Sequence, residues 1–566
     1  MRQHNQNRKR RHLRRFQGFT TSMFLLGATT PALMAQTMTV MSGEVSNVGN
    51  TTVEMLTVEA GGTLNVIPSA NFNLTGSMAT TIDNSGVINT NTASDFQFAR
   101  GVSNSGAINV DSGMSASPTD IEVAADTTLT GGGTITLSGA NAGITGAISG
   151  VDLDIDGQTI QGQGALGRNT IDIINSSGGV IDANVGGQTL VIDAAAGGLT
   201  NAGTIEATNG GTLEIDNTVV NNAGGTITAQ TGSNVLLDGT TTINGGTISS
   251  VDTGEVRTDV SSNVFLNGVT NTDSLVVGNV ADLGIEGTIT NSGEITFDST
   301  VFSPTDIEVQ TPGATLTGGG TVTLSGSNAG INGGGTLTIG NQTIQGAGSL
   351  GRNTIDITNT AEGTILANVD GEALVIDVST IDFSNDGSLG VDNGALLQII
   401  GDLDSSDTST LFGEGTITAS GGDILHSGLI APDDSLVLDA NVLLDSDSEI
   451  QIDIGALGFD VLSVTDDLTL DGLLSLSLLD GFTPDALDTF EIITSGSLAG
   501  SFANVTNGGI LQTTDGLGAF TVNFGPGSGL GANQVVLSSF SAIPEPASAS
   551  LLMMGGMTLL MRRRRI

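Results

Sequence analysis

The residues best suited to catalysis are two arginines in identical surroundings. Arg168 and Arg352 each lie in the sequence LGRNTIDI, and no lysine follows Lys9. Cleavage of an acidic sugar by elimination needs a basic side chain beside acidic metal ligands, and glycoside hydrolysis needs paired carboxylates. An arginine in a folded chain more often forms an ion pair, and Asp172 is too far along a strand to be the partner of Arg168. We therefore expect each arginine to pair with a carboxylate on an adjacent turn of the chain.

One histidine and several alternating carboxylates complete the chemically useful set. His426 has no nucleophile or metal ligand near it in the sequence, so we expect it to lie in a solvated turn. VDLDID (151–156) and DSDSEIQID (445–453) place acidic residues at every second position, on one face of a strand. Calcium could bridge such carboxylates, but no glycine-framed calcium repeat is present, which favours a solvated acidic face. We predict no catalytic residue and no metal site, with calcium as the one candidate cofactor.

The body of the chain reads as short strands. It contains no Cys, Trp or Tyr and is rich in glycine, so no disulfide can stabilise it. Ile, Val and Leu alternate with polar residues in runs such as TLTGGGTITLSG (128–139) and GTLTIGNQTIQG (335–346). Gly and Asn separate these runs, as expected for strands of four to six residues joined by turns.

Repeats occur on two scales. A cadence of apolar, polar, Asn, small, Gly, any and apolar residues recurs along the body, as IDNSGVI (82–88), VSNSGAI (102–108), LTNAGTI (199–205), ITNSGEI (289–295) and FSNDGSL (383–389). Neighbouring copies such as those at 82 and 102 are about 20 residues apart, which is roughly the length of one coil of a β-solenoid. On the larger scale, SPTDIEV begins at 117 and 303, LTGGGT at 129 and 316, and LGRNTIDI at 166 and 350, so the offset is nearly constant. A block of several coils, about 102–216, is therefore duplicated at about 289–400. Stacked folds tolerate duplication in whole coils, because each coil contacts only its neighbours.

These patterns predict an all-β fold, a right-handed parallel β-solenoid. One coil of about 20 residues cannot bury its own apolar row, whereas stacking at ~4.8 Å buries a continuous column. Residues 41–425 would form roughly 19 such coils. We expect Gly and Asn at corners that need positive φ, and hydrogen-bonded ladders of Asn side chains. A string of β-sandwiches is the alternative, but the cadence is too short for one.

Charge is segregated between the body and the two ends of the chain. Only four basic residues lie between Gln36 and Met561, whereas all 59 acidic residues lie between Glu44 and Glu545. Phosphate binding needs clustered Lys and Arg, so nucleic acid is excluded as a partner of this acidic body. At the N-terminus, a basic region to Arg15, an apolar segment and small residues predict a signal peptide over 1–35, cleaved after Ala35.

The last residues, 543–566, differ in character from the body. Pro544, Glu545 and Pro546 form a helix-breaking tripeptide. An uncharged run of fifteen residues, 547–561, follows it, and four arginines come directly after that run: Arg562, Arg563, Arg564 and Arg565. A helix of that length spans ~22 Å, short of the ~30 Å hydrocarbon core, and the arginines would stay on the cytoplasmic side. This order resembles the PEP-CTERM sorting signal of Gram-negative bacteria. The resemblance implies an exosortase as partner, processing near Pro544–Pro546, transient membrane insertion, and association with extracellular polysaccharide or biofilm matrix.

Composition also changes after residue 425. The Leu- and Asp-rich region 426–523 resembles the C-terminal module that closes many autotransporter-like and PEP-CTERM β-solenoid proteins, and a last coil does need its open edge covered. Residues 524–542 read as a linker, with a final strand near VVLSSF (535–540), before a short C-terminal hydrophobic helix.

Two classes of function remain. The favoured one is an exported, non-enzymatic rod of the cell envelope, outer surface or extracellular matrix, adhesin-like and sorted through its tail. The alternative is a polysaccharide lyase or hydrolase exported by the same route. Convergence of an arginine, histidine or carboxylate cluster in a groove would favour the enzyme.

Overall fold

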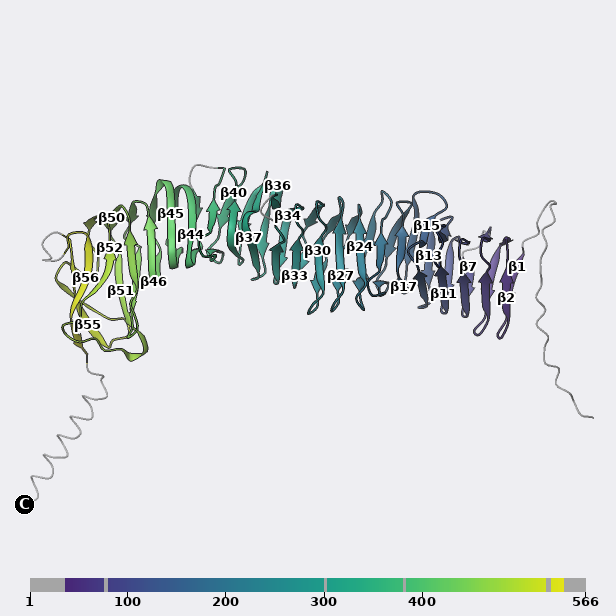
Figure 1. Ribbon diagram of the computed structural model, residues 1–566, viewed down its shortest axis with the longest axis horizontal. Coiled ribbons are helices and arrows are strands. Elements are labelled where there is room, and N and C mark those ends of the chain that lie inside the picture. The colour runs from purple at the N-terminus through teal and green to yellow at the C-terminus, as the bar shows by residue number, and fades with distance from the viewer. Residues whose placement is uncertain (1–35, 76–79, 300–302, 380–382, 526–530, 544–566) are drawn as a thin grey trace, which may run out of the picture.

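The chain forms an elongated rod of stacked β-coils (Figure 1). The computed structural model describes residues 36–75, 80–299, 303–379, 383–525 and 531–543. These residues form a parallel β-solenoid of about 20 turns. One short 3-10 helix, η1 (Leu479–Gly481), is the only helical element in the described part of the chain. The predicted all-β parallel solenoid is confirmed. The right-handed sense of the coil, the C-terminal cap module and the hydrophobic helix after it stay predictions.

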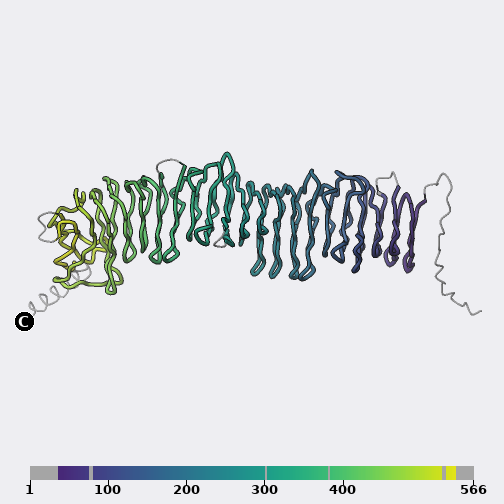
Figure 2. Tube along the Cα trace, turned by 45° about the horizontal axis from the view of Figure 1, so that its top comes forward, coloured from purple at the N-terminus to yellow at the C-terminus, as the bar shows by residue number. Residues whose placement is uncertain are grey.

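Each turn contributes three strands to three parallel sheets, seen edge-on as stacked loops in Figure 2. In one turn these are β16 (Val151–Ile155), β17 (Thr159–Gly162) and β18 (Gly164–Gly167). They pair with the next turn, β19 (Ile171–Asn175), β20 (Val180–Ala183) and β21 (Thr189–Ile192), respectively. We call the three sheets face A, which contains β16, face B, which contains β17, and face C, which contains β18. Longer strands such as β36 (Thr305–Thr317) and β45 (Thr410–His426) run round a corner from one face to the next.

The core is a set of apolar columns along the rod axis. Strand residues alternate between buried and partly exposed, as in the buried, intermediate, buried sequence of β16. On face B, isoleucines of successive coils are register partners and are fully buried; the column is Ile88, Ile108, Ile135, Ile160, Ile181, Ile205, Ile227 and Ile248. Burying such a side chain contributes about 1.5–3 kcal/mol, so the aliphatic columns supply much of the stability of a rod that contains no Trp or Tyr.

The asparagines of the cadence form the predicted ladders inside the corners. Asn175 Nδ2 donates to Asn201 Oδ1 at 2.8 Å, and Asn201 Nδ2 donates to Asn222 Oδ1 at 2.7 Å. All three side chains are fully buried. Asn84 and Asn104, from the first two copies of the cadence, are joined in the same way at 2.7 Å.

Glycines and asparagines with positive φ occur along the rod, as expected, for example Gly210 and Asn209, but the glycine of the cadence has a different role. Gly106 and Gly203 do not have positive φ. A Cβ added to Gly203 would lie 2.4 Å from the carbonyl oxygen of Gly179, and one added to Gly106 would lie 2.1 Å from that of Gly86. Close approach of the backbones of stacked coils therefore requires glycine here, because any side chain would separate the coils.

The duplicated block is displaced by one face, not by a whole number of coils. Eight successive pairings lead along face A from β10 (Gly101–Asn104) to the first half of β34 (Asp282–Asn291). The copy of β10 is the second half of β34, which pairs with β32 (Thr270–Asn271) on face B. The prediction of whole-coil duplication was wrong, although Leu129 and its copy Leu316 are both fully buried, as expected.

Parallel stacking continues beyond the predicted module boundary at 425/426. β45 pairs in parallel with β46 (Leu429–Asp439), and parallel pairs continue to β53 (Ser497–Gly500). Antiparallel pairing begins where β56 (Gln534–Ala542) joins β52 (Phe490–Thr494) and β55 (Gly518–Phe524). β54 (Gly509–Gln512) also pairs antiparallel with β55. The final strand predicted near VVLSSF (535–540) is present as β56, which completes this terminal sheet. Residues 526–530 of the predicted linker lie outside the described residues.

The predicted processing sites lie outside the described residues. These are the signal peptide with Ala35, the tripeptide Pro544, Glu545 and Pro546, the hydrophobic segment after it, and Arg562–Arg565. No helix in the described residues is long and apolar enough to cross a membrane.

Candidate functional site: the duplicated arginine corner

Arg168 and Arg352 occupy matching corners of the rod. Arg168 follows β18 with a φ of 47°, and Arg352 follows β39 (Thr343–Leu350) with a φ of 45°. Positive φ is uncommon for residues other than glycine, so the surrounding contacts must hold the corner. The Asn169 amide donates to the carbonyl of Asp193 at 2.7 Å, and Thr170 Oγ1 donates to the carbonyl of Gly167 at 2.6 Å.

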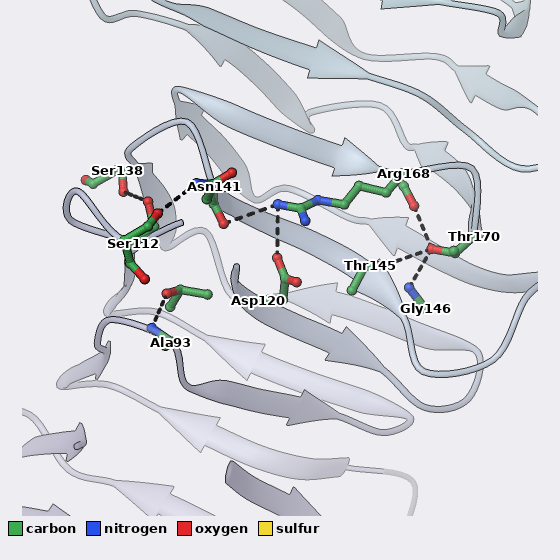
Figure 3. A network of polar contacts seen from close by, with 12 residues as sticks. Ala93, Ser112, Asp120, Ser138, Asn141, Thr145, Gly146, Arg168 and Thr170 are labelled. Atoms are coloured by element: carbon green, nitrogen blue, oxygen red, sulfur yellow. Dashed lines mark hydrogen bonds and ion pairs between the residues drawn. The ribbon is translucent and has the colours of Figure 1, made fainter. Parts of the chain in front are cut away.

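Each arginine reaches across one coil to an aspartate two coils away. Arg168 Nη2 lies 3.3 Å from Asp120 Oδ1, an ion pair without hydrogen-bond geometry, and donates to the carbonyl of Asn141 at 3.2 Å (Figure 3). In the second copy, Arg352 Nη1 donates to Asp306 Oδ2 at 2.8 Å. The expected ion pairs are confirmed, but the expectation of an adjacent coil was wrong.

A glycine on the intervening coil makes this reach possible. Gly143 on β15 (Ala142–Gly146) is the register partner of Asp120 on β12 (Thr119–Val123). A Cβ added to Gly143 would lie 2.8 Å from both Arg168 Nη2 and Asp120 Oδ1. Gly330 has the same place in the second copy, where an added Cβ would lie 2.5 Å from Arg352 Nη2. We call this arrangement of aspartate, glycine and arginine on three successive coils the staple.

Burial governs the electrostatics of the staple. Asp120 is 6% exposed, and desolvation raises its pKa to about 6, although Arg168 opposes the shift. Asp95, its register partner on β9 (Asp95–Phe98), and Glu122 raise the pKa of Asp120 further. Desolvation also raises the pKa of Asp306 in the second copy, again opposed by its arginine.

The staple does not offer its groups to a substrate. Asp95 and Asp120 are paired carboxylates, and burial raises the pKa of both, that of Asp120 to about 6. Paired carboxylates with a raised pKa are typical of glycosidases. However, the Asp120 side chain is only 9% exposed and Oδ1 is sealed from solvent beneath Arg168. A general acid must come within hydrogen-bond reach of the bond that it cleaves. The arrangement instead joins three coils, and the displacement of the duplicate places one staple on face C and the other on face A.

His426 is not the solvated turn residue that we expected. It ends β45, is 1% exposed, and both ring nitrogens are buried without a hydrogen-bond partner. Its register partners are Ser405 and Leu444, so it occupies the position that Asn385 holds two coils earlier. Burial lowers the pKa of His426 to about 4. His426 is not a register partner of any staple residue.

The alternating carboxylates lie on the outer faces, as predicted. Asp152 and Asp154 are partly exposed while Val151, Leu153 and Ile155 between them are buried. Among the described residues, no group of three or more His, Asp and Glu side chains is placed to hold a metal ion. Sequence reasoning missed the partners of the arginines, although SPTDIEV, which supplies Asp120 and Asp306, is duplicated together with LGRNTIDI.

Removing the arginine of a staple should destabilise the neighbouring coils. Replacing Arg168 with methionine leaves Asp120 buried and unpaired, and we expect a loss of about 2 to 3 kcal/mol at pH 7, below that for a fully buried pair because the guanidinium is partly exposed. The loss should shrink below pH 6, where Asp120 takes up a proton. Urea denaturation at pH 7 and pH 5, with hydrogen exchange to locate the affected coils, measures both effects.

Arg257 supplies the matched control. It pairs with Glu255 at 2.9 Å and Asp298 at 3.1 Å, both partly or largely exposed. Exposed pairs contribute less than about 1 kcal/mol, so Arg257→Met should change stability little at either pH. Equal losses in the two variants would show that the staple adds nothing beyond a surface ion pair.

No family model and no curated protein matches the chain. Among solved structures, the crystal structure of the Haemophilus influenzae Hap adhesin aligns with 12% sequence identity and a TM-score of 0.32. The alignment covers 88% of this chain and 64% of the adhesin chain, so this chain spans less than two thirds of the length of that protein. The fold assignment above rests on the strand pairing of this chain itself.

Proposed function

We propose that this chain is an exported, non-enzymatic rod of the cell surface or extracellular matrix, adhesin-like in its use. The observation that carries the proposal is the staple. The only duplicated cations of the body are held in ion pairs that join coils, and the carboxylates beside them are buried. Residues that could have formed a catalytic site therefore contribute to a long, stiff scaffold.

The sorting route rests on the ends of the sequence. Basic residues are concentrated at the two termini of an otherwise acidic chain, and Pro544–Pro546 precede a short apolar run and four arginines. Arginine costs about 2.5 to 3.5 kcal/mol at the membrane centre, so Arg562–Arg565 would stop export and present the tripeptide at the outer face. We propose an exosortase of a Gram-negative envelope as the enzyme that cuts there.

Mass spectrometry of the C-terminus from native cells tests the route. We expect the recovered protein to lack Arg562–Arg565. Deleting these arginines should release unprocessed protein, whereas replacing Pro544 and Pro546 with alanine should leave it membrane-bound and uncut. Thermal stability of the purified body should not change in either variant. Native protein that keeps its four arginines would instead support a plain tail anchor.

The non-enzymatic role has its own test. Purified protein incubated with acidic polysaccharides should produce no unsaturated or reducing ends, because Arg168 and Arg352 are engaged in ion pairs. Cleavage that disappears in Arg168→Ala or Arg352→Ala would establish the lyase or hydrolase alternative.

A further inference from the structure

A shallow cavity lies on face A near the middle of the rod, where Figure 1 labels β34 and β36. Its volume is about 240 Å³. Four successive coils line it, through β28 (Thr242–Asn244), β31 (Asn263–Asn267), β34 and β36. The cavity is separate from the staple residues Arg352 and Asp306, which do not line it.

One of the residues that line this cavity is a buried glycine, Gly284. Gly284 on β34 lies in register between Phe265 on β31 and Glu308 on β36. A Cβ added to Gly284 would lie 2.3 Å from Cδ1 of Phe265 and 3.2 Å from Nε2 of Gln310. The aromatic ring and the amide therefore lean over the position from which a side chain is missing.

The matching position beside the first staple lacks these features. Asp95 and Asp282 are equivalent, because each is the register partner of a staple aspartate, so Gln97 occupies the position of Gly284. Ala124, directly after β12, occupies the position of Gln310. Gly284 thus lacks the side chain that Gln97 has, and Gln310 carries an amide where Ala124 has a methyl group.

The chemistry of the lining fits one class of ligand. Phe265 is partly exposed, whereas most phenylalanines of the described chain are buried. The cavity is also lined by three amide residues, Asn244, Asn267 and Gln310, and by Thr242 and Thr311. An apolar ring face beside several amides and hydroxyls complements a pyranose, which presents C–H bonds on its face and hydroxyls at its rim.

Charge narrows the class further. Glu286 lines the cavity, and Asp282 and Glu308 belong to the same two strands. No Lys or Arg is among the lining residues, so uronic acids and sulfated sugars would be repelled. The volume is below the 300–1,000 Å³ typical of sites for drug-sized ligands, and it suits a single ring.

We propose that this cavity binds one uncharged hexose unit of a glycan. The inference deepens the proposed function, because a surface or matrix rod would meet such polymers outside the cell. Affinity for one unit should be weak, in the millimolar range, because only one small ring is buried.

Titration of the purified full chain with maltotetraose, cellotetraose and tetragalacturonate, followed by saturation-transfer NMR and calorimetry, tests the proposal. At least one neutral tetrasaccharide should bind, and tetragalacturonate should bind at least tenfold more weakly. Phe265→Ala and Gln310→Ala should each weaken neutral binding about tenfold. Gly284→Gln, which installs the residue of the first copy, should abolish it.

Phe412→Ala is the matched control. Phe412 is also partly exposed and lies over a glycine, Gly390, but it is on face C and does not line this cavity. Binding should persist within twofold in this variant, and melting curves of all four variants separate lost binding from lost structure. No binding of either neutral probe, stronger binding of tetragalacturonate, or binding unchanged in Phe265→Ala would each overturn the proposal. None of these binding results changes the expected mass of the processed C-terminus. Failure of the glycan proposal can therefore be told apart from failure of the proposed export route.

Discussion

Replacing Asn201 with alanine is expected to lower the free energy of unfolding of the surrounding coils by about 3 kcal/mol. Its side chain accepts hydrogen bonds from Asn175 Nδ2 at 2.8 Å and from the Gly203 amide at 3.2 Å, and donates to Asn222 Oδ1 at 2.7 Å. Alanine leaves these groups with fewer partners in a fully buried corner. Each buried group that loses its partner costs about 1–3 kcal/mol. Urea denaturation gives the size of the loss, and hydrogen exchange should place it in the coils around β22 (Leu199–Asn201).

The outer surface supplies the control for this experiment. Asn65, Asn89 and Asn109 form a second ladder, with Asn89 Nδ2 donating to Asn65 Oδ1 at 2.8 Å and Asn109 Nδ2 donating to Asn89 Oδ1 at 2.9 Å. These side chains are partly exposed, so water can replace the lost partner. Asn89→Ala should cost less than about 1 kcal/mol. Similar losses in Asn89→Ala and Asn201→Ala would mean that burial does not determine the strength of a ladder.

The contrast between the two ladders shows what a repeat pattern can predict. The cadence identifies Asn84, Asn104 and Asn201 as equivalent, and alternation places their apolar neighbours inside. Stacking must then align the amides, since equivalent residues of successive coils lie one above another. The parallel solenoid, its columns and its inner ladders therefore follow from period and alternation alone.

The displacement of the duplicate by one face could not be predicted in the same way. Coil length varies: Ile108 is the register partner of both Ile88 and Ile135, and it is closer along the chain to Ile88. A nearly constant offset between two copies therefore does not fix a number of coils. The separation of Asp120 and Arg168 along the chain was equally ambiguous, because it does not show that an intervening glycine lets the arginine span two coils.

His426 was misplaced for a related reason. The cadence continues through it as ILHSGLI (424–430), but His426 replaces the asparagine, so this copy of the repeat was missed. Register nevertheless continues through Asn385, Ser405 and His426, so the imidazole lies where buried asparagines stood in earlier coils. The column becomes apolar only one coil later, at Leu444.

This position should make the coils around β45 sensitive to acid. The pKa of His426 is about 4 in the folded chain and 6.5 in the unfolded one, because burial disfavours the charged imidazole. The backbone at Leu429 and Gly428, and then the charge of Asp445, offset only part of that effect. Between these values the unfolded state binds a proton that the folded state does not. Stability therefore falls as pH drops from 6.5 to 4, by roughly 3 kcal/mol when complete. The staple around Asp120 has the opposite sign: its pKa is raised to about 6, so its coils gain stability as pH falls through that value.

Hydrogen exchange at pH 7 and pH 4.5, corrected for the intrinsic pH dependence of exchange, can separate these two trends along one rod. Protection near β45 should fall, while protection near β12 should rise. His426→Leu, which extends the apolar column from Leu444, should abolish the loss near β45 and leave the gain near β12 unchanged. The attribution to His426 fails if β45 loses the same protection at pH 4.5 in this variant. A coil contacts its neighbours and, at a staple, the coil beyond, so contacts along the rod are local. An acid-sensitive coil near one end can therefore open while the stapled coils around Asp120 stay folded.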